Sequence, residues 1–526
     1  MSDRHAAGDE NWRPRANPWL IAIVVTLVAF MEILDTTIVN VALPHIAGAM
    51  SSSQDESTWT LTSYLIANGI VLPISGFLSR TFGRKLYFLV CIAAFTACSL
   101  LCGMAESLWQ LILFRLLQGF FGGGLQPNQQ SIILDTFPPA QRGRAFSVTA
   151  IATVVAPVLG PTLGGWITDH YSWRWIFLIN VPIGLFTFFA VLHLVEDPPW
   201  ARRAGRANMD YIGLGFIALG FGCLQFVLDR GEDEDWFASP SIRLFALLAA
   251  IGLVGAVYWL LYAKTPIVNL RVLADRNFAV GALMVFIMGL ILYSSAVLIP
   301  QLTQRQLGYT ATWAGLVLSP GAVIVGMLIP IVGRIMPYVQ TRLVIVVGLL
   351  ALGFAMLYAH GLSPEIDFFT LAKMRMAQTI GLAFLFVPIS TLAYLTLPRD
   401  QNADAAALYT MFRNLSGSIG ISLATALVTS RSQVRQGYLA ESLSPLDPNF
   451  NATLSEVSRA LTAQGLAPSQ IPGAALGWMH ETLLNQSAVL AYIDVFGYCA
   501  MVAFAAVPFA FLFSPAKALG GGPGAH

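Results

Sequence analysis

The sequence predicts an all-α membrane protein in which two six-helix bundles are joined by two inserted helices. Of the 526 residues, 56% are hydrophobic and only 11% are charged, a composition that is foreign to soluble globular proteins. Apolar stretches of roughly 20 residues, long enough to cross a bilayer, recur along the whole chain. The first and last parts of the chain also repeat one another at a fixed offset, which indicates two related halves.

The apolar stretches predict fourteen membrane-spanning helices. They cover residues 19–43, 59–79, 86–104, 108–134, 144–168, 175–195, 209–229, 243–262, 278–302, 312–334, 342–360, 367–394, 403–430 and 488–513. The polar N-terminal tail carries Arg13 and Arg15 directly before a full-length span, so we expect no cleavable signal peptide.

The positions of Lys and Arg set the orientation of these spans. With the N-terminus inside, the inner connections hold most of the 29 basic residues. Because cytoplasmic loops are enriched in Lys and Arg, the sequence predicts both termini in the cytoplasm. The net charge of +1 gives no indication of a nucleic-acid partner.

An internal repeat relates spans 1–6 to spans 9–14. Arg115 and Arg375 are 260 residues apart, and the same offset separates Gln118 from Gln378. It also relates these pairs: Thr136 and Thr396, Pro138 and Pro398, Gln141 and Gln401, Ala145 and Ala405, Gly160 and Gly420. We therefore predict an N-terminal bundle over residues 1–195, an inserted two-helix linker over 196–276 and a C-terminal bundle over 277–526, as in transporters whose halves surround a midplane site.

The repeat is asymmetric in its acidic residues. Aligning Ile33–Asp35 with Ile291–Tyr293 places a tyrosine opposite Asp35. We therefore expect the proton-active carboxylates to be concentrated in the N-terminal half.

A long polar segment, about residues 431–486, separates spans 13 and 14. The predicted topology places it outside, and its length for a connection indicates either a function or disorder. The spacing of Leu454, Val457 and Leu461 is typical of a short amphipathic helix. This segment and the outward-facing acidic run Glu232–Asp235 are candidates for partner contact, with plain solvated loops as the alternative.

Asp35 and Arg115 place opposite charges within the membrane at a similar depth. Asp35 lies eight residues before Leu43, and Arg115 lies seven residues after Leu108, so both lie roughly 11–12 Å below the outer surface. Since ionisable groups inside a membrane are functional candidates by default, we interpret Asp35 as a proton site and Arg115 as its fixed partner. A purely structural ion pair is the alternative. Glu32 shares a helix face with Asp35 and is a second proton site, a cation-recognition group or a solvated side chain.

Other polar residues within the spans are candidates for the substrate cavity. Arg413 and Asn414 interrupt span 13 near its middle, where substrate contact, gating and a buried internal pair are all open. Arg375 has no acid opposite it in its own half, which favours structural anchoring. Further candidates, which generic helix packing explains about as well, are Asn40, Gln126, Asn128, Tyr293 and Tyr409.

Four motifs follow one another in order along the chain. They are Leu34–Pro44 in span 1, Gly76–Lys85 after span 2, Arg115–Gly119 in span 4 and Ala156–Gly165 in span 5. Together they resemble the major facilitator superfamily, specifically its fourteen-helix drug:proton antiporter branch, over essentially the whole chain. Asp229–Gly231 and the Gly-rich tail ending in Ala525 and His526 add to this resemblance.

The resemblance implies a major facilitator fold and proton-coupled export of hydrophobic small molecules across a bacterial inner membrane. Such a transporter uses the proton gradient and needs no cofactor. The resemblance also implies the inner-membrane component of a tripartite pump, with a periplasmic membrane-fusion adaptor and an outer-membrane channel as partners. An exporter dedicated to one endogenous metabolite is the alternative with the same fold.

The span 5 motif and the loop after span 2 are candidates for conformational roles. In span 5, small residues allow close helix contact and prolines bend the helix; the residues are Gly160, Pro161, Gly164 and Gly165. The resemblance implies that this motif marks exporters, with a packing kink as the alternative.

The loop after span 2 contains Gly76 and Gly83 but departs from the family pattern, because Arg80 stands where most members carry an aspartate. Asp404, at the start of span 13, could supply the missing acid to Arg80 or Arg84. A plain positive-inside role for the basic residues is the alternative.

Cysteine and histidine usage argues against disulfide, metal and catalytic chemistry. The five cysteines all lie in apolar spans without ligand-like neighbours and are interpreted as small core residues. The seven histidines are scattered and unpaired with any evident nucleophile. A multi-span membrane enzyme is therefore a remote alternative, and we expect no enzymatic activity and no metal site.

Overall fold

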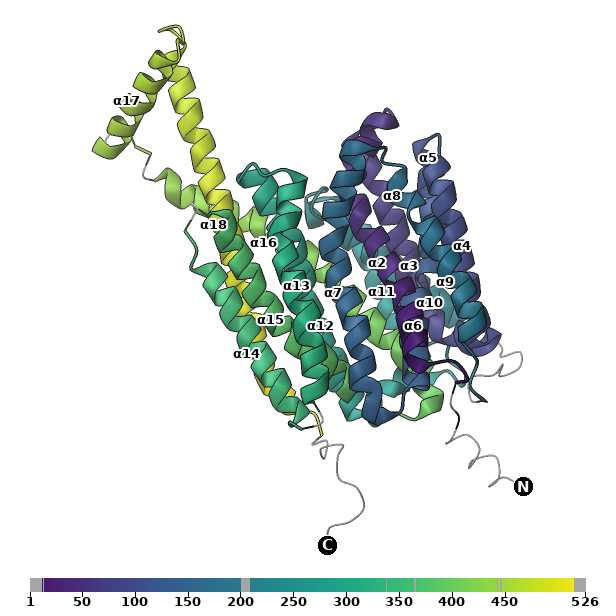
Figure 1. Ribbon diagram of the computed structural model, residues 1–526. Helices are drawn as coiled ribbons and strands as arrows, with labels where there is room; N and C mark the ends of the chain where they lie inside the picture. The colour runs from purple at the N-terminus through teal and green to yellow at the C-terminus, as the bar shows by residue number, and fades with distance from the viewer. Residues whose placement is uncertain are drawn as a thin grey trace, which may run out of the picture.

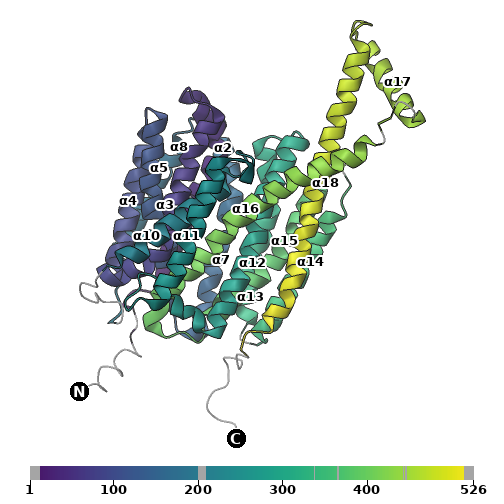
Figure 2. The same ribbon diagram turned by 180° about the vertical axis from the view of Figure 1, so that it is seen from behind.

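The computed structural model describes residue 12 and residues 14–199, 209–336, 338–363, 366–441, 443–444 and 447–514. Within these ranges the chain forms helices and their connections, without a strand. The helices form an N-terminal and a C-terminal group that stand side by side (Figures 1 and 2). Gly520–Gly524, Ala525 and His526, and much of the expected linker before residue 209, lie outside the described residues.

The N-terminal group contains the first eight labelled helices. They are α2 (Pro18–Ala49), α3 (Gln54–Phe82), α4 (Arg84–Met104), α5 (Leu108–Gly122), α6 (Leu125–Thr136), α7 (Pro139–His170), α8 (Trp175–Leu178) and α9 (Asn180–Leu194). Helix starts follow from local chemistry: Asn17 caps α2 with Pro18 in its first turn, and Ser53 forms a capping box with Glu56 at α3. Helices α5 and α6 together form one candidate span.

The C-terminal group repeats this arrangement and adds a long outer segment. It consists of α12 (Arg276–Gln301), the π-turn η4 (Leu302–Gln306), α13 (Ala311–Ile335), α14 (Thr341–His360), α15 (Phe368–Ala393), η5 (Arg399–Gln401), α16 (Asn402–Ala440), α17 (Pro448–Ala463) and α18 (Ile471–Ala510). Helix α15 begins 260 residues after α5, and each start is capped by an oxygen-bearing side chain, Ser107 for α5 and Asp367 for α15.

A helical hairpin connects the two groups. It comprises α10 (Tyr211–Arg230), η2 (Trp236–Ala238), α11 (Pro240–Tyr262) and η3 (Leu270–Ala274). Gly220 and Gly252 allow α10 and α11 to touch, because a Cβ on either glycine would collide with the other helix backbone. The hairpin packs on α3, where the Thr62 hydroxyl donates to the Asp229 carboxylate.

Twelve helices of the described residues are long and apolar enough to cross a membrane, and α7 makes a thirteenth if its two bent halves form one span. The bend of 43° separates Pro139–Pro157 from Leu159–His170, at the place where the prolines predict one. Helix α16 has the length of a span but is more polar. It is packed between α12, α18, α3 and α6, so its polar face contacts protein. Twelve or thirteen is thus the observed count, and fourteen stays a prediction.

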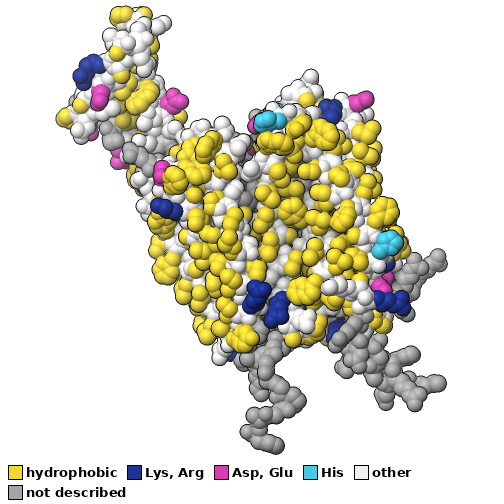
Figure 3. Space-filling model, in the orientation of Figure 1, with side chains coloured by type: hydrophobic (Ala, Val, Ile, Leu, Met, Phe, Trp, Pro, Cys, Tyr) yellow, Lys and Arg dark blue, Asp and Glu magenta, His cyan; other side chains and the backbone are white. Residues whose placement is uncertain are grey.

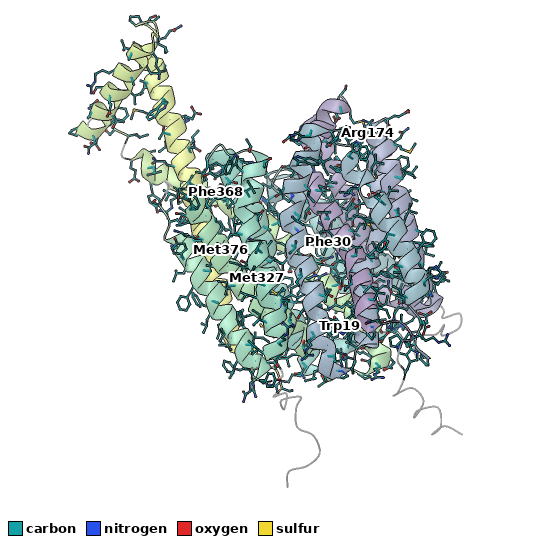
Figure 4. All side chains as sticks on the ribbon, viewed as in Figure 1. Trp19, Phe30, Arg174, Met327, Phe368 and Met376 are labelled. Carbon is teal, nitrogen blue, oxygen red and sulfur yellow. The ribbon has the colours of Figure 1, made fainter. Side chains whose placement is uncertain are left out.

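The long helices run between two ends of the molecule, which we call the lower and the upper end. The lower end is marked by Trp19 near the start of α2, and the upper end by Arg174 beside α8 (Figure 4). Hydrophobic side chains cover the sides of both groups on the face drawn in Figure 3, and charged side chains are sparse between the two ends. This distribution is that of a protein surrounded by lipid.

An arm projects from the upper end of the C-terminal group. It is formed by the outer parts of α16 and α18 with α17 packed on α18 (Figures 1 and 2). Arg431 and Arg435 of α16 hold Asp494 of α18 at its base, with guanidinium–carboxylate distances of 3.0 and 2.6 Å. The predicted amphipathic helix around Leu454, Val457 and Leu461 is confirmed as α17.

Candidate functional site

The acidic face of α2 is turned into the N-terminal bundle. On its other side α2 packs against α7, where a Cβ at Gly160 would collide with Thr37 and a Cβ at Gly164 would lie 2.8 Å from Ile38. Because residues three apart share a helix face, Glu32 and Asp35 point together toward the neighbouring helices. Glu32 is 2% exposed and Asp35 is fully buried.

Asp35 is surrounded by three side-chain donors. Arg115 Nη1 of α5 donates to its Oδ2 at 2.6 Å, while Gln118 Nε2 at 3.1 Å and Asn180 Nδ2 at 2.8 Å donate to its Oδ1. Both charged side chains have an exposure of 0%. The acid and the base that the sequence places at one depth are therefore in direct contact, as a charge-assisted pair in which both carboxylate oxygens accept hydrogen bonds.

The surroundings of Arg115 hold its guanidinium in one orientation. Its Nε donates to the Thr60 carbonyl at 3.1 Å, and Nη1 also donates to Gln118 Oε1 at 2.8 Å. The Tyr64 ring lies under the guanidinium, 4.2 Å from its central carbon. Cation–π attraction and these hydrogen bonds together fix the guanidinium in place. Arg115 is therefore a permanent positive charge that balances the negative charge of Asp35.

Glu32 has neutral partners only. Asn68 Nδ2 donates to its Oε1 at 3.1 Å, the Tyr64 hydroxyl donates to the same oxygen at 3.3 Å, and Gln126 Nε2 donates to Oε2. Gln126 Oε1 in turn accepts from Arg413 Nη2 of α16. A chain of two hydrogen bonds thus connects a carboxyl group of the N-terminal bundle to a guanidinium of the C-terminal bundle.

Glycines of α5 bring α3 close enough to position the partners of Glu32. A Cβ at Gly122 would lie 2.8 Å from the Tyr64 hydroxyl oxygen, and a Cβ at Gly123 would lie 2.8 Å from the Asn68 carbonyl oxygen. Gly122 and Gly123 therefore permit an approach to α3 that any larger residue would prevent.

Three of the predicted cavity residues gather around Glu32. Gln126 and Arg413 form the chain described above. Tyr293 lies within electrostatic range of both Arg413 and Glu32 and packs against Gly417 of α16, with a ring carbon 2.9 Å from the position of a Cβ there. Arg413 is only 3% exposed, so it faces protein between the bundles.

The other predicted cavity residues lie apart from this cluster. Asn128 donates to the Gly124 carbonyl of its own bundle at 2.6 Å, and Tyr409 pairs with the Ser390 hydroxyl at 3.0 Å. Asn40 is exposed on α2 and Asn414 is half-buried on α16. Their predicted contribution to a substrate cavity is not tested by these positions.

The predicted gating residues of the loop after span 2, together with Asp404, lie at the lower end, where the bundles are joined. Arg80 of α3 forms an ion pair with Asp404 of α16. Gly76 makes this contact possible, because a Cβ there would lie 2.9 Å from Asp404 Oδ1 and 3.0 Å from the Ala403 carbonyl oxygen. Of the two arginines considered from sequence, the structure thus pairs Arg80 with Asp404.

Arg84 has a different acid. It forms an ion pair with Asp135 of α6, and Asn402 Nδ2 of α16 donates to the same carboxylate at 2.8 Å. Gly83, between α3 and α4, has a φ of +89°, a conformation that favours glycine and that turns the chain so that Arg84 can reach α6.

A second connection at the lower end uses α7 and the end of α15. Arg142 donates to the Tyr394 carbonyl across the bundles at 3.3 Å and to the Leu134 carbonyl at 3.1 Å. The Phe146 ring stacks on Tyr394 with centroids 5.8 Å apart.

The span 5 motif lies farther along α7, where Gly160 and Gly164 face α2. Within the motif, Pro161 is part of α7 and the Gly165 carbonyl accepts a hydrogen bond from the Thr168 hydroxyl.

Sequence reasoning missed several residues of both clusters. Tyr64, Asn68 and Asn180 are polar residues inside apolar spans, which is a signal that could have found them. Asp135 and Arg142 lie in the repeated loop and were hidden among ordinary inner-loop charges.

The comparisons with known proteins agree with this architecture. Residues 25–421 match the profile of the Major Facilitator Superfamily. The chain belongs to the major facilitator superfamily. It is similar to the "Multidrug export protein EmrB" of Escherichia coli (strain K12), at 36% identity over 96% of this chain and 98% of that protein. It is also similar to the "Fatty acid resistance protein FarB" of Neisseria gonorrhoeae, at 34% identity over 95% of this chain and 97% of that protein.

Solved structures of the superfamily share the fold. The proton:xylose symporter XylE has a TM-score of 0.58 at 12% identity, covering 93% of this chain and 96% of that one. At this identity the likeness establishes the arrangement of helices alone. The family and the candidate spans together make the chain a multi-pass membrane protein of the major facilitator superfamily.

In this superfamily member the C-terminal bundle repeats the arginine but replaces the acid. Arg375 Nη1 donates to Gln378 Oε1 at 2.6 Å and to Ser295 Oγ at 3.3 Å, and Gln378 Nε2 also donates to Ser295 Oγ. Ser295 follows Asp35 by the same 260 residues. The alignment of Tyr293 with Asp35 is therefore wrong by two residues, because the hydrogen bonds place Ser295 in the equivalent position.

Proposed function

We propose that this protein is a proton-coupled exporter of hydrophobic small molecules in the inner membrane of a bacterium. The observation that carries the proposal is the buried Asp35–Arg115 pair with Glu32 one turn away, at the face where side chains of α3, α5, α6 and α9 donate to the acids of α2. Intramembrane carboxylates of this kind mark proton pathways in transporters. The names of the related multidrug export and fatty acid resistance proteins support efflux and a hydrophobic cargo.

The proposed topology has fourteen spans with both termini in the cytoplasm. It adds α7 and α16 to the twelve apolar helices, since both run the length of their bundle and pack against it along their sides. The enrichment of Lys and Arg on the side of the N-terminus supports assigning the lower end to the cytoplasm.

In the proposed cycle, a proton from the outside neutralises Asp35 and weakens its hold on Arg115. Gln118 and Asn180, which bond the same carboxylate, then exchange partners, and α2 shifts against α5 and α9. Because Arg115 keeps its charge throughout, the proton taken up by Asp35 is what changes the energy of this contact.

Glu32 couples the same event to the other bundle. When Glu32 is ionised, it orients Gln126 so that the amide oxygen faces Arg413. Protonation of Glu32, or a substrate group that displaces Gln126, releases this connection. The two bundles can then rock about the site, as alternating access requires.

The lower end serves as the closed inner gate in this scheme. The ion pair Arg80–Asp404 and the hydrogen bond from Asn402 to Asp135 join the bundles at the cytoplasmic side, and Arg84 holds the same Asp135 within the N-terminal bundle. In this conformation Asp35 and Glu32 are buried as well, so external protons reach the acids of α2 only after the upper end opens. Opening the inner gate requires these contacts to separate.

The arm is the proposed contact for a periplasmic membrane-fusion adaptor, and through it an outer-membrane channel. In the proposed topology it extends on the outer side, beyond the bundle. It carries exposed apolar side chains that its own helices leave uncovered, Tyr438 on α16 and Leu476 and Trp478 on α18. Exposed apolar groups beyond the membrane boundary are typical of a protein contact.

Proteoliposomes with an imposed pH gradient test the coupling. Internal pH is followed while hydrophobic cations, weak acids and uncouplers are added to wild type, Asp35→Asn and the control Glu106→Gln, whose carboxylate is exposed at the upper end. We expect substrate-dependent proton movement in wild type and the control, and none in Asp35→Asn. Movement that persists in Asp35→Asn would assign coupling to Glu32, and a complete lack of movement in wild type would favour a dedicated metabolite exporter.

A further inference from the structure

Arg375 is a fully buried guanidinium to which no described carboxylate is paired. Its exposure is 0%, and its side-chain hydrogen-bond partners among the described residues are two neutral groups, Gln378 and Ser295. Both contacts use Nη1. The Nε and Nη2 atoms are buried and have no hydrogen-bond partner among the described residues. Burying a cation whose N–H groups are not all hydrogen-bonded lowers the stability of the folded protein, unless an anion or a polar group accepts those hydrogen bonds.

The N-terminal bundle shows what is missing. There Asp35 supplies the negative charge to Arg115, and Gln118 bonds both of them. In the C-terminal bundle Gln378 occupies the place of Gln118, but Ser295 stands where Asp35 would be and donates its own proton to the Leu292 carbonyl at 3.0 Å. The C-terminal bundle therefore keeps the arginine and its glutamine partner but lacks the carboxylate that would balance the positive charge of the arginine.

The location of Arg375 restricts the size of any partner that could balance its positive charge. It follows Phe368, the first residue of α15, by seven residues, which places it roughly 10 Å along the helix from the upper end. Figure 4 shows the neighbouring Met376 below Phe368 on this helix. The side chain lies close to α13, where a Cβ at Gly321 would be 3.1 Å from Arg375 Cγ. Such a packed position suits a small partner.

We propose that Arg375 binds a small monovalent anion, in the first place a halide such as chloride, between α12, α13 and α15. The anion accepts from Nε and Nη2, and supplies the charge that Asp35 supplies in the other bundle. Water could satisfy the hydrogen bonds but would leave the positive charge uncompensated. The proposal concerns the folded bundle and does not depend on proton coupling or on the cargo.

Thermal unfolding of the purified full-length chain in detergent tests the site. The protein is kept in sodium gluconate at constant ionic strength while chloride or bromide replaces gluconate, and binding of ³⁶Cl⁻ is measured by equilibrium dialysis. We expect a saturable rise in the unfolding midpoint and about one bound ³⁶Cl⁻ per chain, since a ligand that binds only the folded state stabilises it. Formate and acetate are titrated in parallel to distinguish a halide from a carboxylate group.

Three variants assign the effect. Ser295→Asp places a carboxylate opposite Arg375, as in the Asp35–Arg115 pair, and we expect it to fold and to lose both the halide response and the bound ³⁶Cl⁻. Arg375→Gln is expected to lose them as well. Lys373→Gln removes an exposed charge of the same helix and should keep the full response.

Two results would overturn the proposal. One is a wild-type protein without halide stabilisation or bound ³⁶Cl⁻, or with a response to formate and acetate only, which would reject a halide. The other is a response that Ser295→Asp retains in full, because a site already neutralised by a carboxylate has no use for a second anion. If Arg375→Gln does not fold, Ser295→Asp alone decides.

Discussion

At the residue scale, two carboxyl groups one helical turn apart have different surroundings. Asp35 faces a guanidinium, so losing its charge leaves Arg115 buried without a counter-charge. Glu32 faces the amides of Asn68 and Gln126 and a tyrosine hydroxyl. No cation contacts Glu32 directly among the described residues, so the loss of its charge leaves no contacting cation without a counter-charge. Their contributions to stability should therefore differ, although both are buried acids of one helix.

Stability measurements on purified variants test this difference. We expect Asp35→Asn to destabilise the protein by roughly 3–5 kcal/mol, because removing one partner of a buried ion pair leaves the other uncompensated. Glu32→Gln should cost about 1.5–3 kcal/mol, the scale of hydrogen bonds to a charged group. The readout is the free energy of unfolding, and the double variant Asp35→Asn/Arg115→Gln should recover part of the loss. Equal losses in the two single variants would contradict this account.

At the element scale, helix contacts in the N-terminal bundle depend on glycines, which have no side chain. Gly122 and Gly123 allow α5 to touch α3, and Gly160 and Gly164 allow α7 to touch α2. Without a hydrophobic driving force between helices in lipid, such close backbone contact is what holds neighbouring spans together. The same contacts fix the depth and direction of Tyr64, and so connect packing to the site.

Gly122→Ala tests the contact of α5 with α3. We expect a loss of about 1–3 kcal/mol, because the new methyl group would lie 2.8 Å from the Tyr64 hydroxyl oxygen and overpack the interface. Transport should fall with it, since Tyr64 contacts both Glu32 and Arg115. The matched control is Gly69→Ala on α3, where a Cβ meets nothing within 4 Å and which should leave both transport and stability intact.

At the scale of the whole molecule, the described polar contacts between bundles gather toward the lower end. Three of these contacts connect elements that are far apart in the sequence. They are the ion pair Arg80–Asp404, the hydrogen bond from Asn402 to Asp135 and the hydrogen bond from Arg142 to the Tyr394 carbonyl. Since α16 contributes Asp404 and Asn402 at its start and Arg413 farther along, one helix joins the lower contacts to the Glu32 cluster. A movement of α16 would therefore affect both regions.

Charge exchange tests the lower contact. Asp404→Arg places two cations together beside Gly76 and should reduce transport by about tenfold or more, since like charges at this distance repel. Arg80→Asp combined with Asp404→Arg should restore a large part of the rate in proteoliposomes. If the double variant is no better than Asp404→Arg, the pair has no role in closing the lower end.

Replacing residues 438–478, which include the exposed Tyr438, Leu476 and Trp478, by a short Gly/Ser linker tests the arm, because this part of α16, α17 and α18 extends beyond the bundle. We expect transport in proteoliposomes within about twofold of wild type, as the spans are untouched. Resistance of cells to exported compounds, and co-purification with an adaptor protein, should be lost. Full cellular resistance in this variant would remove the arm from the proposed assembly.

The fold was largely accessible from the sequence, because membrane spans are long apolar stretches that need no knowledge of the tertiary structure. The exception was α16, whose polar residues face other helices and so do not satisfy a hydropathy test. The candidate site was accessible only in part. Asp35, Arg115, Glu32 and Gln126 stand out as polar residues in apolar spans, whereas Asn180 and Asn68 become partners of the acids only through packing.

By itself the sequence determined the membrane class, the repeat of 260 residues and the presence of an acid and a base at one depth. Only the tertiary structure decided which groups touch: that Arg80 pairs with Asp404, that Gln126 connects Glu32 to Arg413, and that Ser295 replaces Asp35 in the second bundle. The physical reason is that burial in lipid depends on the composition of each helix alone. A hydrogen bond or an ion pair, in contrast, depends on the rotation and register of two helices, which close packing at glycines sets.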